Sequence, residues 1–89
     1  MIICKVIGHV WATKKERTLE GLKLMVVQEE GDDDTFVAAD VVGAGIGERV
    51  LVVSGSTARR ALGRDTTSAD CAIVGIIDSL EVDKEKIQK

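Results

Sequence analysis

Short apolar runs alternate with charged or glycine-containing stretches along the chain. In the first run, residues 2–13, every even position is small or apolar, and this period of two predicts a strand with one buried face. The even positions are Ile2, Cys4, Val6, Gly8, Val10 and Ala12. The odd positions include Ile3, Ile7 and Trp11, so the second face is also too apolar for an ordinary solvated surface. We therefore expect another surface to cover it.

Four more strands and one short helix follow in the pattern. The apolar runs that predict the strands lie at residues 22–28, 36–40, 50–53 and 72–77. Residues 56–62 are compatible with a two-turn helix that has Ser56 as N-cap and Gly63 at the C′ position. The fourth and fifth runs are apolar on both faces, which is typical of strands covered on both sides.

This order of elements predicts a mainly β fold. Five short strands with one helix between the fourth and fifth favour a small, partly open barrel of the OB type. A split β-α-β arrangement is less favoured because it needs two substantial helices. The chain has no internal repeat and no Pro, so we expect one domain over residues 1–82 and a charged C-terminal tail over residues 83–89.

Composition changes this picture in one respect. The chain has 89 residues, of which 45% are hydrophobic, and a domain of this size buries only about 60% of its unfolded surface. A marginal protomer with surplus apolar strand surface is best completed by self-association. The net charge of -3 and the aromatic content of 2% argue against nucleic acid as a partner.

The chain also gives no sign of a membrane or an oxidising compartment. No apolar run approaches the roughly 20 residues of a membrane span, and the first residues do not follow the pattern of a signal peptide. Cys4 and Cys71 form neither a close metal-ligand pair nor a disulfide framework, so we expect buried thiols in a reducing cytosol.

Candidate chemistry is sparse. His9 is the only histidine and has no nearby cluster of ligands or catalytic partners. The carboxylates of residues 32–34 do not have the spacing of an EF-hand, and a solvated turn is the better interpretation. Arg59, Arg60 and Arg64 form a basic cluster that suits the end of a helix. We therefore predict no catalytic residue, no metal and no cofactor.

The glycine-rich stretch at residues 43–48 is the most distinctive local feature. It differs from a dinucleotide-binding loop because its third glycine comes one residue early and a strand, not a helix, follows. A tight turn where backbones pack closely is the favoured interpretation. An OB-type module for single-stranded nucleic acid and a small enzyme or cofactor carrier stay open as alternatives at this point.

Four segments, in order, carry a resemblance to a known family. They are residues 6–15 (VIGHVWATKK), residues 19–28 from LEGLKL onward, residues 40–59 with DVVGAGIGERVLV and GSTAR, and residues 70–78 (DCAIVGIID). The chain resembles the EutN/CcmL family, the pentameric vertex proteins of bacterial microcompartment shells. It departs from the family pattern at Cys4 and Cys71, where Gly or Ala is expected, at Thr57, where Ser is usual, and before Asp70, where a Pro is missing.

The resemblance implies a structural protein without catalysis of its own. Its partners would be four further copies of itself, which form a five-fold ring, and the hexameric shell proteins of the flat facets. The candidate loop around the five-fold pore comprises Gly43, Ala44, Gly45, Ile46, Gly47 and Glu48. The apolar second faces of the first and last strands provide the candidate subunit interface, namely Ile3, Ile7, Trp11, Val74 and Ile76.

Overall fold

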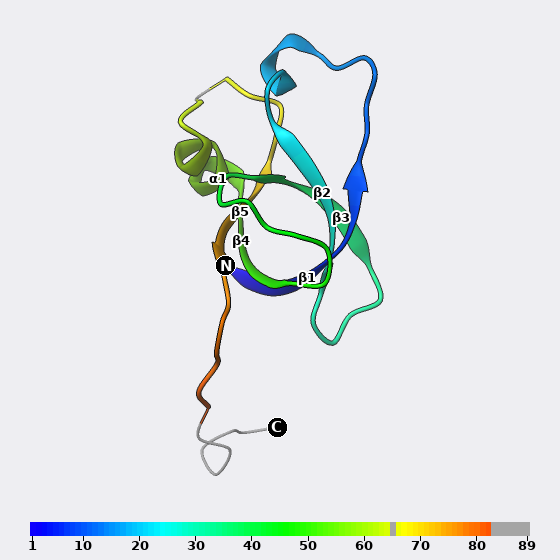
Figure 1. Cartoon of the computed structure of the whole chain (residues 1–89). Coiled ribbons are helices and arrows are strands. Elements are labelled where there is room, and N and C mark those ends of the chain that lie inside the picture. Colours follow the sequence, from blue (N-terminus) through cyan, green and yellow to red (C-terminus); the bar gives the residue numbers. More distant parts are fainter. Residues whose placement is uncertain (65, 83–89) are drawn as a thin grey trace.

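The structure, a computed structural model, describes residues 1–64 and 66–82 and folds as a five-stranded β-barrel (Figure 1). The strands are β1 (Ile2–Val10), β2 (Lys23–Glu29), β3 (Thr35–Asp40), β4 (Arg49–Ser54) and β5 (Cys71–Ile76). They follow the order β1-β2-β3-β5-β4, and pairing of β1 with β4 closes the barrel. The predicted mainly β barrel is confirmed. The parallel seam between β3 and β5 has only two residue pairs, so the barrel that we expected to be partly open closes through a short ladder.

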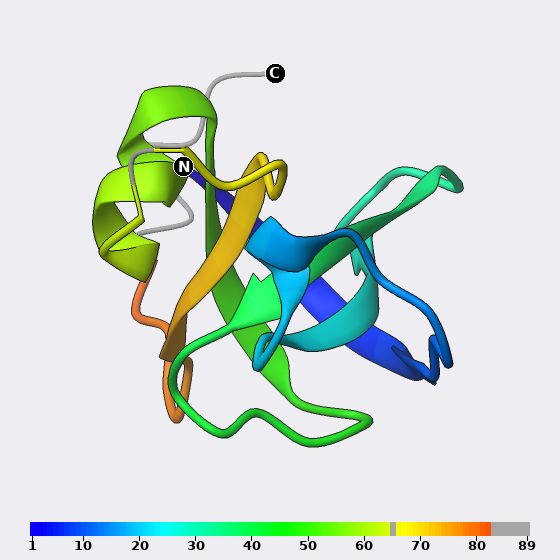
Figure 2. The ribbon, with the colours of Figure 1, turned by 90° about the horizontal axis from the view of Figure 1, so that it is seen from above.

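The helix α1 (Gly55–Leu62) lies between β4 and β5, as the sequence predicts. Its N-cap is Ser54, which makes no side-chain capping hydrogen bond, so the assignment of Ser56 as N-cap is wrong. The chain reaches the helix directly from β4, and the helix therefore begins before Ser56. Gly63 ends the helix in the left-handed conformation (φ 67°), as expected. Seen from above, α1 covers one side of the barrel beside β4 and β5 (Figure 2).

Two apolar clusters hold the fold together. The main core fills the barrel and consists of Cys4, Val6, Met25, Val27, Ala38, Ala44, Val50, Val52 and Ile73. A smaller cluster of Val53, Ala58 and Ala72 joins α1 to the outside of β4 and β5. The two clusters use opposite faces of the same strands, since neighbours such as Val52 and Val53 point to opposite sides of the sheet. This explains why the fourth and fifth strands are apolar on both faces.

Strand β1 departs from the simple alternation that its sequence predicts. Its register against β2 shifts between Val6, which pairs with Val27, and Gly8, which pairs with Val26. This bulge reverses the faces beyond it, because a slip of one residue moves every later side chain to the other side. His9 pairs with the buried Met25. The expectation that Gly8, Val10 and Ala12 continue the buried face of Cys4 and Val6 is therefore wrong.

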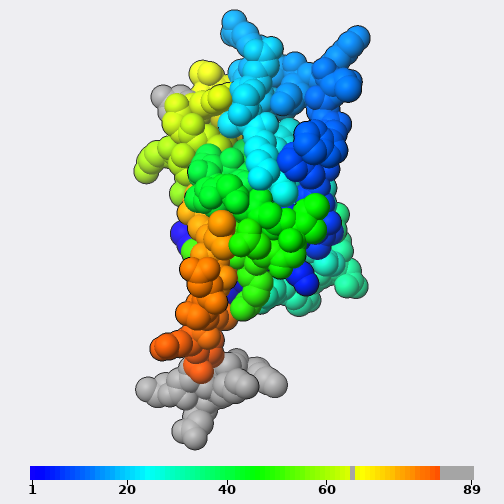
Figure 3. Space-filling view, in the orientation of Figure 1, coloured from blue at the N-terminus to red at the C-terminus, as the bar shows by residue number. Residues whose placement is uncertain are grey.

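Two segments project from opposite ends of the barrel (Figures 1 and 3). At one end, the loop from residue 11 to residue 22 contains the 3-10 helix η1 (Arg17–Leu19) and contacts the segment before β5 through hydrogen bonds of Thr18 with Thr67 and Ser68. At the other end, residues 78–82 run away from the barrel and are exposed. The charged tail expected at residues 83–89 lies outside the described residues.

Candidate functional site

The glycine-rich loop, residues 41–48, joins β3 to β4 and lies on the surface of the barrel (Figures 2 and 3). The residue directly before the loop is Asp40, the last residue of β3, and its side chain is fully buried. Asp40 Oδ1 accepts hydrogen bonds from the backbone N–H groups of Val42 (3.0 Å) and Gly43 (3.1 Å), and Oδ2 accepts one from Ala44 (2.7 Å). One carboxylate thus fixes the first half of the loop. Gly43 has a φ of 80°, a conformation that glycine adopts without strain.

Lys23 completes this arrangement from the neighbouring strand. It lies opposite Asp40 in the register of β2 and β3. Its Nζ lies 3.4 Å from Asp40 Oδ2 and donates a hydrogen bond to the carbonyl oxygen of Ala44 (3.0 Å). The buried carboxylate is therefore both paired with a charge and hydrogen-bonded, as a buried charge must be to be tolerated.

The second half of the loop is held by the turn from Gly45 to Glu48 and by β1. Glu48 Oε1 accepts the N–H of Gly45 (2.6 Å), and the N–H of Glu48 donates to the carbonyl of Gly45 (3.2 Å). The N–H of Gly47 donates to the carbonyl of Val6 (2.8 Å), while the N–H of Val6 donates to that of Glu48 (2.9 Å). These bonds leave the side chain of Ile46 67% exposed.

Sequence reasoning identified the six loop residues but did not identify the two that fix the loop's first half. Asp40 and Lys23 lie 17 positions apart in the chain, and only the pairing of β2 with β3 brings them together. The signal that could have found Asp40 is a carboxylate directly before a run of small residues, because a short acidic side chain commonly accepts hydrogen bonds from the next backbone N–H groups.

The candidate interface residues occupy different environments within one chain. Trp11 is 84% and Ile7 42% exposed, whereas Ile3 is half-buried. Val74 packs against the cluster beneath α1, and Ile76 packs against the main core. Their apolar character is thus partly explained by contacts inside the protomer. Ile7 and Trp11 keep the most apolar surface free for a partner.

Trp11 belongs to a shallow groove next to the end of β1. The rings of His9 and Trp11 stack in parallel with their centroids 4.0 Å apart. The groove has a volume of about 390 Å³ and includes Leu22 and Leu24 together with Lys15 and Lys23. Stacking on Trp11 gives His9 a packing role.

The other sequence candidates occupy structural positions. Cys4 is buried, as expected, whereas Cys71 is only half-buried. Burial raises the pKa of the Cys4 thiol from 9.0 to about 11 and is also the main cause of the raised pKa of Cys71, so both thiols stay protonated at neutral pH. Arg64 donates to the carbonyls of Thr18 and Glu20, which ties the helix end to the loop after β1. Asp32 accepts the N–H of Asp34 within its turn.

Among residues 1–64 and 66–82, no three His, Cys, Asp or Glu side chains gather in a way that could hold a metal ion. Within the same part of the chain, no helix has the length and apolar character needed to cross a membrane.

Comparison with known proteins gives concordant matches. The family described as ethanolamine utilisation protein EutN/carboxysome matches residues 1–78. The microcompartment shell vertex protein GrpN of Rhodospirillum rubrum is 45% identical, over 91% of this chain and 97% of its own length. The carboxysome shell vertex protein CcmL of Thermosynechococcus vestitus is 46% identical, over 93% of this chain and 89% of its own. The solved structure of the pentameric GrpN superposes with a TM-score of 0.82 at 42% identity, covering 92% of this chain and 99% of that one.

Proposed function

The chain belongs to the EutN/CcmL family, and from this membership we propose that five copies of it form a ring at a vertex of a polyhedral shell. Its role is structural: it is a vertex protein in the shell of a bacterial microcompartment. The observation that carries this function is the family match over residues 1–78 together with likeness to a pentameric shell protein over nearly the whole fold.

The partners follow from geometry. Six-fold units alone tile a flat sheet, and five-fold units introduce the curvature that closes it. We therefore propose hexameric shell proteins as the neighbours of the ring. Catalysis is left to the enclosed enzymes, and the chain contributes closure of the shell.

Two surfaces of the protomer serve assembly in this proposal. Loop 41–48 approaches the five-fold axis, where small residues allow five backbones to converge. A cyclic ring joins two different patches of each protomer. The exposed apolar side chains of Ile7 and Trp11 belong to one of these patches and meet a neighbouring copy. The apolar surplus of this small chain supports such a contact.

The first test is the mass of the purified protein. Native mass spectrometry is expected to give a complex of about 48 kDa, five times the 9.5 kDa chain. A stable monomer at micromolar concentration would contradict the proposed ring.

The second test addresses closure. Co-expression with a hexameric shell protein is expected to produce closed particles under the electron microscope, whereas the hexameric protein alone produces sheets, tubes or particles with open vertices. If closed particles form equally well without the chain, it does not act as the vertex.

A further inference from the structure

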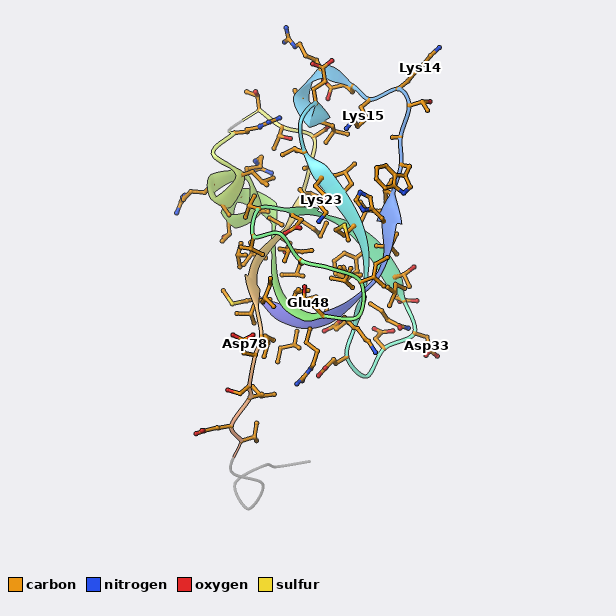
Figure 4. All side chains as sticks on the ribbon, viewed as in Figure 1. Lys14, Lys15, Lys23, Asp33, Glu48 and Asp78 are labelled. Carbon is orange, nitrogen blue, oxygen red and sulfur yellow. The ribbon has the colours of Figure 1, made fainter. Side chains whose placement is uncertain are left out.

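Glu48 is the only charged side chain in loop 41–48. Five copies of it at one axis would form a ring of carboxylates if the side chains pointed outward, and like charges gathered in this way repel one another and attract cations. The direction of this one side chain therefore decides whether the loop presents charge or aliphatic surface. Figure 4 shows Glu48 on the loop, away from Asp33 on the β2–β3 hairpin and Asp78 on the C-terminal segment.

We propose that Glu48 is a positioning residue that holds the Gly45–Glu48 turn closed, and that Ile46 is the side chain which the loop presents to its surroundings. Glu48 is exposed to solvent, and its carboxylate folds back onto its own turn, where Oε1 accepts the N–H of Gly45 at 2.6 Å. Such a bond to a charged acceptor is stronger than one between neutral groups. Ile46, between the two bonded residues, is 67% exposed, more than Val41 (47%) and Val42 (38%) in the first half of the loop.

The space around Gly45 supports this assignment. A Cβ atom at position 45 would lie 3.3 Å from Glu48 Oε1, closer than an ordinary contact, so the absence of a side chain at Gly45 lets the carboxylate reach the backbone. The C-terminal end of the turn is also attached to β1, through hydrogen bonds of Gly47 and Glu48 with Val6. The turn therefore presents Ile46 on a backbone that is fixed at three points.

The consequence for the shell rests on the proposed function. Where five loops meet at the axis, the aperture is bordered by backbone and aliphatic side chains, and not by five carboxylates. Aliphatic side chains cannot replace the hydration shell of an ion, so a constriction formed by them favours small uncharged molecules over hydrated ions.

Amide hydrogen exchange tests the positioning role within each chain. Glu48→Ala is expected to speed exchange of the Gly45 N–H on the order of tenfold, because that donor loses its charged acceptor. Glu48→Gln keeps an acceptor oxygen without the charge and is expected to restore most of the protection. Ile46→Ser, in the same turn, and Asp33→Ala, an exposed carboxylate elsewhere, are the matched controls and leave Gly45 unchanged. Unchanged exchange in Glu48→Ala would overturn the proposal.

Terbium binding tests the character of the aperture. The wild-type pentamer and its Glu48→Gln variant are expected to bind Tb³⁺ with the same stoichiometry and affinity, because the acidic β2–β3 hairpin is common to both. One additional tight site per wild-type pentamer, lost in Glu48→Gln, would show that the carboxylates face the axis and would overturn the proposal. Failure to form a pentamer concerns the proposed function alone, since the exchange measurement reads the turn in any oligomeric state.

Discussion

At the scale of single residues, Asp40 makes the largest contribution to the structure of loop 41–48. Its buried carboxylate accepts three backbone N–H groups and pairs with Lys23. Asp40→Ala leaves these donors without acceptors, so we expect the free energy of unfolding to fall by roughly 2–3 kcal/mol. Urea denaturation measures this difference. Asp33→Ala, which removes an exposed carboxylate, is the control with a change below about 0.5 kcal/mol. Equal effects of the two substitutions would contradict the assigned role.

The ion pair between Glu30 and Arg49 makes a pH-dependent contribution. Arg49 Nη2 donates to Glu30 Oε2 at 2.8 Å, and this contact lowers the pKa of Glu30 below 4.5. A lowered folded-state pKa gives stability that is present above the unfolded value of 4.5 and is lost as the pH falls through the folded value. Arg49→Met should therefore flatten the acid limb of the stability profile, measured as urea midpoints below neutral pH. Arg60→Met, which removes a charge from α1, should keep the wild-type slope.

Which residues could be predicted at this scale depended on the range of their interactions. The six residues from Gly43 to Glu48 are recognisable because glycine at close spacing indicates a turn. The direction of the Glu48 side chain and the contribution of Lys23 were not predictable, because both depend on distances set after the strands pair. The cap of α1 was misplaced by two residues because Ser54 and Ser56 offer the same side chain.

At the scale of elements, the five strands were predictable from their apolar runs and the helix from its flanking residues, whereas the bulge in β1 was not. A bulge adds one residue without changing the composition of the strand, so residues 2–13 still read as one alternating run. The bulge separates the half of β1 that supplies Cys4 and Val6 to the core from the half that carries the His9–Trp11 stack. One half of β1 therefore contributes side chains to the core, and the other half contributes to the surface.

Strand β5 allows a test of the two cores. Ile76 packs on the main core, so Ile76→Asp places an unpaired charge against the barrel interior, and we expect loss of the cooperative thermal transition in circular dichroism. Val74 packs on the smaller cluster under α1, and Val74→Asp is expected to detach the helix and to prevent assembly. Val82→Asp, at an exposed position, should fold normally. A stable pentamer in both β5 variants would show that the strand has been misassigned.

At the scale of the whole molecule, the sequence predicted the class of assembly better than it predicted which residues form the contacts between protomers. Four family motifs in order extend over most of 89 residues, and this was sufficient to indicate a shell vertex protein. The surface that joins one protomer to the next depends on how outward faces are divided between α1 and a partner. Val74 illustrates the difficulty, since its apolar side chain already has a neighbour within the chain.

Trp11 provides the sharpest test of the ring contact, because it is the only tryptophan and is 84% exposed in the single chain. If it meets a neighbouring copy, its fluorescence emission should lie at short wavelength in the pentamer and move to longer wavelength on dilution, in parallel with loss of the pentamer in mass photometry. Large aromatic residues carry much of the energy of an interface, so Trp11→Ala is expected to weaken assembly at least about tenfold. Leu80→Ala, in the exposed segment 78–82, is the control for loss of apolar surface. Emission typical of solvated tryptophan in an intact pentamer would place Trp11 outside the subunit contact and leave Ile7 as its main apolar candidate.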